Sequence, residues 1–244
     1  MLMVVRSIVF NVLFYLNTAL WLVIALPTFF LPYRAILGVA KAWGRCNLVL
    51  LRIVAGIDCE IRGREKIPPG ALIVAPKHQS AWETFALLSL FDNPLFIVKR
   101  ELEWIPIFGW LMIKGRMVPV DRGAGSHALS AMTERARLEL ADGRQLIIFP
   151  EGTRRPAGAE PRYKYGVAHL YAAEGVPCLP IALNSGLFWP RRSLRRYPGT
   201  VLVEVLDPIP PGLDKRAFMA HLQTALEQAT ARLVAEGRGS VSDH

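Results

Sequence analysis

A histidine and a glutamate five residues apart, His78 and Glu83, are the first candidates for chemistry in this 244-residue chain. His78 follows a short apolar run, residues 71–75, which predicts a buried strand of a parallel sheet. Ser80 and Glu83 have the Ser-x-x-Glu spacing of a capping box, so we expect a helix to begin there and to continue to Phe91. His78 then lies in the turn between a strand and a helix, where open α/β sheets bind their ligands.

This pair suits general base catalysis on a substrate hydroxyl, because an imidazole held by a carboxylate accepts a proton readily. A second interpretation is that Glu83 only caps its own helix and that His78 is a polar loop residue. The stretch by itself leaves both interpretations open.

Two more predicted strands run into charged or small polar residues. Strand 95–98 is followed by Lys99 and Arg100, and strand 145–149 leads into the block Phe149-Pro-Glu-Gly-Thr-Arg154. If the three strands are parallel neighbours, their carboxyl ends meet at one edge of the sheet. Cations at that density suit a phosphate group. The glycine of the block allows a tight turn, and its threonine adds a hydroxyl donor.

Strands and helices alternate from Asp58 onward, which predicts one α/β domain with a mostly parallel central sheet flanked by helices. Strands are expected at residues 59–62, 71–75, 95–98, 117–120, 145–149, 178–183 and 201–206. Further helices are expected at residues 126–141, with Ser126 as N-cap, at 165–174 and at 214–236, and an interrupted helical stretch at 103–113. Pro119 places its strand at an edge of the sheet.

Residues 7–31 are almost entirely apolar and long enough to cross a hydrocarbon core of ~30 Å. The run lacks a signal-peptide cleavage pattern, so we expect it to be retained. Asn11, Asn17 and Pro27 interrupt it, and a full span and a helix dipping into one leaflet both remain open. A buried soluble helix is the third interpretation.

The next segment, residues 34–57, has basic residues on one helical stripe and apolar residues opposite. The basic set is Arg34, Lys41, Arg45 and Arg52, and the apolar set is Ile36, Val39, Trp43, Leu50 and Val54. This pattern predicts a helix in a membrane interface, with Trp43 in the boundary layer. A helix packed against the domain with a solvated basic face is the alternative. We therefore assign residues 1–57 to a membrane anchor, an apolar helix plus an amphipathic interfacial helix, and residues 58–244 to the α/β domain.

Composition points to a membrane and to an anionic partner. Hydrophobic residues make up 52% of the chain and the mean hydropathy is +0.28. The net charge of +9 fits nucleic acid, an anionic bilayer or phosphorylated substrates. The basic, aromatic segment 188–197 could contact anionic lipid or the phosphates of coenzyme A, or be a solvated loop. Three cysteines without metal-ligand spacing, Cys46, Cys59 and Cys178, fit reduced thiols in a cytoplasm-facing protein.

Four sequence blocks resemble, in their order, the motif blocks of the glycerolipid acyltransferase family. They are His78-Gln-Ser-Ala-Trp-Glu83, Val98-Lys-Arg-Glu-Leu102 with Ile105-Pro-Ile-Phe-Gly109, Phe149-Pro-Glu-Gly-Thr-Arg154, and Val176-Pro-Cys-Leu-Pro-Ile181. Within the family the likeness is strongest to the 1-acyl-glycerol-3-phosphate (lysophosphatidate) acyltransferases. It runs from about Ile73 to Trp189. The Phe-Pro-Glu-Gly-Thr-Arg block is its most specific part.

The resemblance implies transfer of an acyl group from acyl-CoA or acyl-carrier protein to the free hydroxyl of 1-acyl-glycerol-3-phosphate, forming phosphatidate in phospholipid biosynthesis. His78 is then the general base and Glu83 orients it, although the common family block has Asp at that position. The positions similar to glycerol-phosphate-binding ones are Lys99, Arg100, Glu151, Gly152, Thr153 and Arg154. We expect no covalent intermediate, metal, cofactor or nucleic acid, and oxyanion donors from backbone amides of the His78 turn.

The implied location is the cytoplasmic face of a membrane, such as a bacterial inner membrane. One alternative is an acyltransferase for another lysolipid, such as a lyso-ornithine lipid, whose acceptor lacks the phosphate. Another is a membrane-tethered protein that binds anionic ligands without catalysis. The second alternative does not explain why His78 and Glu83 occur beside three cationic strand ends.

Overall fold

A seven-stranded sheet forms the centre of the chain, for which a computed structural model describes residues 1–121 and 125–242, with side chains outside 122–128 and 240–244. The strands are β1 (Ile57–Arg62), β2 (Leu72–Pro76), β3 (Pro94–Lys99), β4 (Val118–Val120), β5 (Gln145–Ile147), β6 (Cys178–Leu183) and β7 (Gly199–Val205). Their order is β1-β7-β6-β2-β5-β3-β4. All neighbours are parallel except β6 and β7, so the expected mostly parallel sheet is confirmed.

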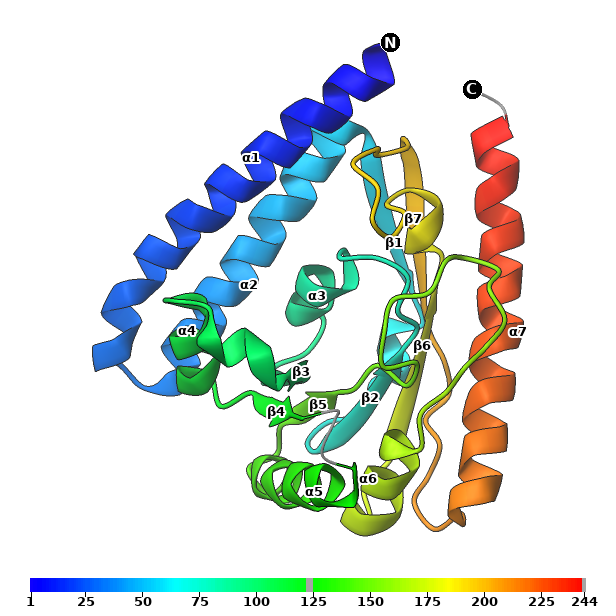
Figure 1. The fold of residues 1–244 in the computed structure, drawn as a ribbon. Coiled ribbons are helices and arrows are strands. Elements are labelled where there is room, and N and C mark those ends of the chain that lie inside the picture. Colours follow the sequence, from blue (N-terminus) through cyan, green and yellow to red (C-terminus); the bar gives the residue numbers. More distant parts are fainter. Residues whose placement is uncertain (122–124, 243–244) are drawn as a thin grey trace.

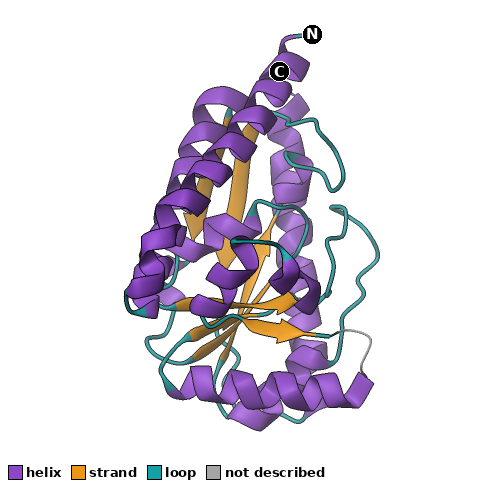
Figure 2. Cartoon of the chain, turned by 60° about the vertical axis from the view of Figure 1, so that its left-hand side comes forward, coloured by secondary structure: helices purple, strands orange, loops and turns teal. Residues whose placement is uncertain are grey.

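Helices cover both faces of this sheet (Figure 1). They are α1 (Leu2–Ala25), α2 (Tyr33–Leu50), α3 (Glu83–Ala86), α4 (Phe108–Lys114), α5 (Gly125–Ala141), α6 (Gly166–Glu174) and α7 (Lys215–Ser242). Side chains of β2 alternate between the faces, because successive residues of a strand point to opposite sides. Leu72 and Val74 join the core beneath α1 to α3, and Ile73 and Ala75 join the core beneath α5 to α7. Figure 2 shows the strong twist of the strands between these layers.

Several expected boundaries differ from the structure, among them the terminal helix, which runs to Ser242 rather than ending at residue 236. The helix predicted from Ser80 to Phe91 is only the short α3, followed by a 3₁₀ turn at Leu87–Ser89. The strand predicted to reach Phe149 ends at Ile147. Strand β4 lies at the sheet edge, as predicted from Pro119. A proline in a central strand would remove a ladder hydrogen bond. The predicted N-cap at Ser126 lies outside the described side chains.

Helix α1 packs lengthwise on the rest of the protein, and its polar side chains point inward. Arg6 Nε donates to the carbonyl of Val54 at 2.7 Å, and Asn17 Nδ2 donates to Asn47 Oδ1 at 3.1 Å. Phe10 is fully buried. The stretch Leu2–Phe30 is long and apolar enough, by length and composition, to cross a membrane. The polar residues that interrupt it therefore bind protein rather than solvent.

The outward face of α1 is apolar. Its exposed side chains are Leu2, Val4, Val5, Ile8, Val9, Val12, Tyr15, Leu16, Leu20, Val23 and Ile24. These positions recur every three to four residues, so they form one continuous stripe along the helix. We call this stripe the outer face of α1. A stripe of this kind marks an interaction surface, since soluble monomers seldom expose large contiguous apolar patches.

Helix α2 packs on the same face of the sheet as α1 and α3 (Figure 1). The Trp43 indole donates to Thr18 Oγ1 at 3.2 Å, and its ring packs edge-on against Phe85 with centroids 5.8 Å apart. The apolar side of α2 therefore contacts protein, and the expected placement of Trp43 in a membrane boundary layer is not what the structure has. Arg34, Arg45 and Arg52 are exposed, as the packed-helix alternative requires.

The cysteines are free thiols, as expected from their spacing. Cys178 is fully buried on β6, and Cys59 is half-buried on β1. Burial raises the pKa of the Cys59 thiol to about 12, so that thiol stays protonated near neutral pH. Two of the three cysteines thus serve packing.

Candidate active site

The carboxyl ends of β2, β5 and β3 lie side by side, as the sequence predicted. The three strands are parallel neighbours in that order. A cavity of about 470 Å³ opens beside their ends, within the range of ligand pockets. Apolar side chains of α1, α2, β3 and α4 form most of its wall. Three chemically active side chains also line it, and they are His78, Lys99 and Arg154.

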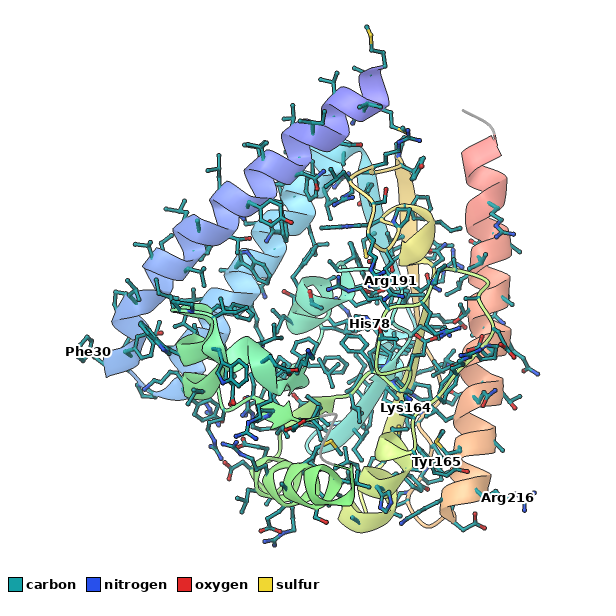
Figure 3. All side chains as sticks on the ribbon, in the orientation of Figure 1. Phe30, His78, Lys164, Tyr165, Arg191 and Arg216 are labelled. Carbon is teal, nitrogen blue, oxygen red and sulfur yellow. The ribbon has the colours of Figure 1, made fainter. Side chains whose placement is uncertain are left out.

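His78 is held in one orientation at this cavity, and Figure 3 shows it at the centre of the molecule. Its ring stacks on the ring of Phe149, with centroids 3.8 Å apart and an 18° interplanar angle. Nδ1 lies 3.7 Å from Glu83 Oε2. Nδ1 is buried and has no hydrogen-bond partner among the described residues, so the carboxylate is the polar group that it faces. The predicted pair is therefore brought together, at a distance slightly longer than a hydrogen bond.

Glu83 both caps the turn and faces the imidazole. Its carboxylate, fully buried, accepts backbone N–H bonds from Gln79 and Ser80 at 3.1 Å and a bond from the Ser80 hydroxyl at 3.3 Å. The hydroxyl of Ser185 donates to Oε1. Ser80 Oγ accepts from the amide of Trp82 at 2.9 Å. In a regular capping box this oxygen would accept from the amide of the next residue, Glu83. One carboxylate thus combines capping and orientation, because its Oε2 accepts from Ser80 and also faces Nδ1 of His78.

The amides of the His78 turn are already occupied. Those of Gln79 and Ser80 donate to Glu83, and that of His78 donates to Glu151 Oε2 at 3.0 Å. The expectation that these amides stabilise an oxyanion is therefore wrong for these three. A donor with an available N–H or O–H has to come from elsewhere in the site or from the substrate complex.

Glu151 lies beneath the turn and not in the cavity wall. It is 2% exposed, and Oε1 binds the ammonium of Lys77, which also contacts Glu227 Oε1 of α7 at 2.7 Å. Tyr163 donates to the same Glu227 oxygen at 2.7 Å. Burial raises the pKa of Glu151, and the adjacent ammonium of Lys77 opposes that rise. We call these four residues the Lys77 network.

The backbone of His78 is fixed from both sides by the loop after β5. Its N–H donates to Glu151, and its carbonyl accepts from the amide of Arg155 at 2.8 Å. Gly152 in the same loop has φ +65°, a conformation that favours glycine. This loop therefore positions both His78 and Arg154.

The remaining predicted residues are more exposed. Lys99 pairs with Glu101 at 2.6 Å and is half exposed, while Arg100 is 3.8 Å from Asp121 and does not belong to the cavity lining. Thr153 is exposed beside half-buried Arg154. The structure thus brings Lys99 and Arg154 to the cavity with His78, and leaves Arg100 and Thr153 outside its wall.

Sequence reasoning missed Lys77, Ser185, Glu227 and Tyr163. One signal was available for Lys77, since a lysine directly after a buried strand requires a carboxylate partner. The partner itself was not identifiable, because Glu227 lies 150 positions away in the sequence.

The chain is similar to known proteins over most of its length. Residues 58–184, about half of the chain, match the model of the Acyltransferase family. A 1-acyl-sn-glycerol-3-phosphate acyltransferase of Pseudomonas aeruginosa is 36% identical over 206 residues, which cover 82% of this chain and 79% of the relative. The human 1-acyl-sn-glycerol-3-phosphate acyltransferase alpha is 29% identical over 202 residues, covering 80% and 71%.

A solved structure has the same fold. The crystal structure of the 1-acyl-sn-glycerophosphate acyltransferase PlsC of Thermotoga maritima superposes with a TM-score of 0.78. The match covers 94% of this chain and 97% of that one, at 22% identity. The extent of the family match and the identity to the Pseudomonas relative decide the assignment: this chain belongs to the acyltransferase family.

Proposed function

We propose that this acyltransferase transfers a fatty acyl group from acyl-CoA or acyl-carrier protein to the free hydroxyl of 1-acyl-glycerol-3-phosphate, giving phosphatidate. The proposal rests on the position of His78. Its ring faces Glu83 and lines an apolar cavity that Lys99 and Arg154 also line. An apolar cavity suits an acyl chain, and two cations beside a base suit an acceptor that carries a phosphate near its hydroxyl. The names of the relatives support the same substrate class.

The chemistry follows from the ring geometry. Since Nδ1 faces Glu83, Nε2 is the nitrogen left for the acceptor hydroxyl. Nε2 takes the hydroxyl proton as the oxygen attacks the thioester carbonyl, and the C–S bond breaks when the tetrahedral intermediate collapses. The imidazolium then gives its proton to the departing thiolate. Glu83 stabilises the imidazolium, so no acyl-enzyme is required.

Each predicted binding residue supports the proposal in its own way. Arg154 and Lys99 line the cavity and are assigned to the phosphate, with Thr153 as a hydroxyl donor at the loop surface. Gly152 provides the turn that presents Arg154. Glu151 contributes through the backbone of His78, since its oxygens are bound to Lys77 and to that amide. Arg100 lies outside the cavity wall, so the contribution assigned to it is the long-range attraction of its positive charge for the phosphate.

We propose further that residues 1–57 hold the enzyme in one leaflet, with residues 58–244 at the cytoplasmic face. The outer face of α1 is apolar, whereas its inner face is bonded to protein along its length, from Arg6 to Asn17. A helix attached in this way can sink into a leaflet sideways without detaching from α2. Free cysteines fit a reducing, cytoplasmic location. The apolar face of α2 belongs to the packing of the protein and not to the lipid.

The test is turnover by the purified chain in detergent micelles with acyl-CoA and a panel of lysolipids. Lysophosphatidate should be the preferred acceptor, and His78→Ala should lower kcat about 1,000-fold, as expected for loss of a general base. A wild-type rate in His78→Ala would exclude His78 as the base. A lyso-ornithine lipid preferred over lysophosphatidate would replace the acceptor but keep the mechanism.

A further inference from the structure

The loop Pro190–Tyr197 carries a charge that the acyl-transfer site does not use. It contains Arg191, Arg192, Arg195 and Arg196, and no acidic residue occurs in the sequence between Asn184 and Val203. No residue of this loop lines the cavity. We call it the arginine loop.

The arginine loop is anchored firmly at its base. The amide of Tyr197 donates to the carbonyl of Phe188 at 2.9 Å and closes the loop. Phe188 is fully buried, and Trp189 packs edge-on against Phe10 of α1 with centroids 5.4 Å apart. The conformation of the loop is therefore supported by the core beneath it.

The loop is also bonded directly to α1. Asn11 Nδ2 donates to the carbonyl of Leu194 at 2.8 Å, and the amide of Arg196 donates to Ser7 Oγ at 2.9 Å. The buried guanidinium of Arg196 donates to Asn11 Oδ1 at 2.6 Å and stacks 4.1 Å above the ring of Trp189. Arg196 thus serves the attachment of the loop.

Other side chains of the loop are exposed close to where its backbone bonds to α1. Leu194 is 72% exposed, and Arg192 and Arg195 are exposed on either side of it. The α1 positions next to Asn11 that face outward are Ile8 and Val12, both more than half exposed. An apolar side chain flanked by arginines, at the border of an apolar stripe, has the arrangement of a membrane-interface contact.

We propose that the arginine loop binds the headgroups of anionic lipids. Leu194 extends the outer face of α1 into the bilayer, and Arg191, Arg192 and Arg195 bind lipid phosphates. The inference rests on the leaflet placement proposed above. Bilayer lipid is favoured over coenzyme A because the loop is bonded to the proposed membrane helix and lies outside the cavity lining.

Flotation with lipid vesicles tests the charges. The full chain should bind vesicles of equimolar phosphatidylcholine and phosphatidylglycerol, and the triple variant R191Q/R192Q/R195Q about 100-fold more weakly, given about 1 kcal/mol for each basic residue near an anionic surface. On phosphatidylcholine alone the triple variant should match the wild type. Leu194→Ser should weaken binding to both kinds of vesicle about 10-fold, through lost apolar burial.

A control removes three charges from α7 instead of from the loop. The variant K215Q/R216Q/R232Q changes α7, and Figure 3 shows Arg216 far from Arg191. This control should bind anionic vesicles like the wild type. Equal losses in both triple variants would mean that only net charge matters and would overturn the proposal, as would wild-type binding by the loop variant.

Trypsin offers a readout on the wild-type chain, useful if α1 alone already saturates vesicle binding. Anionic vesicles should slow cleavage after Arg192 and Arg195 relative to cleavage after Arg216, and phosphatidylcholine vesicles should not. Equal cleavage on both vesicles would overturn the proposal. So would a raised KM for acyl-CoA in micelles with unchanged vesicle binding, which would assign the loop to the donor.

Turnover in micelles separates this proposal from the proposed function. Suppose that the wild-type chain fails to acylate lysophosphatidate while R191Q/R192Q/R195Q still binds anionic vesicles more weakly than the wild type. In that case the acceptor assignment fails and the loop assignment stands. The opposite pattern removes only the loop assignment.

Discussion

The turn after β2 and the ends of β3 and β5 carry the two halves of the site, and they are built differently. Glu83 and Lys77 at the turn are 0% and 5% exposed and fully bonded, whereas the side chains of Lys99 and Arg100 are 50% and 59% exposed. A base has to be oriented before the substrate arrives, because misplacement costs rate. Cations that bind a phosphate can be ordered by the phosphate itself. Changes at the turn should therefore lower kcat, and changes at the cationic ends should raise KM for the acceptor.

After His78→Ala, the largest effect is expected from Glu83→Gln. Both oxygens of the carboxylate accept from backbone N–H groups, so an amide nitrogen in either position would face an N–H donor. We expect kcat to fall about 100-fold with little change in KM for lysophosphatidate, measured in micelles per folded enzyme.

Two further variants sharpen this result. Glu83→Asp keeps the charge and should retain more activity than Glu83→Gln. Glu134→Gln, at an exposed carboxylate paired with Arg137, is the control and should behave as wild type. A wild-type kcat in Glu83→Gln would mean that Glu83 only caps its turn.

The next effect is expected from Lys77→Met, which leaves Glu151 buried without its cation. Removing one partner of a buried ion pair costs about 3–5 kcal/mol, which for a chain of this size lowers Tm by roughly 10 °C. We expect kcat per folded enzyme to fall about 10-fold, because Glu151 also holds the amide of His78. Thermal unfolding by circular dichroism and steady-state turnover measure the two effects.

The pH dependence of that destabilisation has a defined sign. Burial raises the pKa of Glu151 and Lys77 opposes the rise, so the methionine variant should have a still higher pKa. A carboxyl group whose pKa is raised by folding contributes less stability as pH rises through that pKa. The loss of Tm in Lys77→Met should therefore be larger at about pH 8 than at about pH 5. The double variant K77M/E151Q should recover most of the lost Tm, because no fully buried charge is left unpaired and Glu227, whose side chain is 29% exposed, keeps its hydrogen bond from Tyr163. A kcat that merely follows Tm through these variants would mean that the Lys77 network is only structural.

Local patterns in the sequence were enough to place His78 and the cationic residues at the strand ends. Apolar runs followed by polar residues gave β2, β3 and β5, and their parallel pairing then followed from the alternation of strands and helices. Contacts between distant positions were not readable. The burial of Trp43 against Phe85 depends on how α2 meets the sheet, and the Lys77 network depends on where α7 lies. The hydrogen bond from the His78 amide to Glu151 also depends on the tertiary structure.

Arg154→Ala tests the cationic half of the comparison. Losing charge-assisted hydrogen bonds to a phosphate should raise KM for lysophosphatidate about 10-fold or more, while KM for acyl-CoA and kcat change little. Arg162→Ala, at an exposed arginine paired with Glu160, is the matched control and should leave both constants unchanged. Equal increases in both KM values would remove Arg154 from the phosphate site.

The smallest effects should come from Lys99 and Arg100. These two residues are adjacent in the sequence, but only Lys99 lines the cavity. Lys99 lines the cavity but already pairs with Glu101, so Lys99→Ala should raise the acceptor KM only about 3-fold. Arg100 is outside the cavity wall and near Asp121, and Arg100→Ala should change that KM less than about 2-fold. Titration of the acceptor with both variants decides between them. An effect of Arg100→Ala as large as that of Arg154→Ala would require the chain after β3 to turn toward the cavity when the acceptor binds. The cationic half of the site would then be ordered only when the acceptor binds. The His78 turn, in contrast, is held by hydrogen bonds before any substrate arrives.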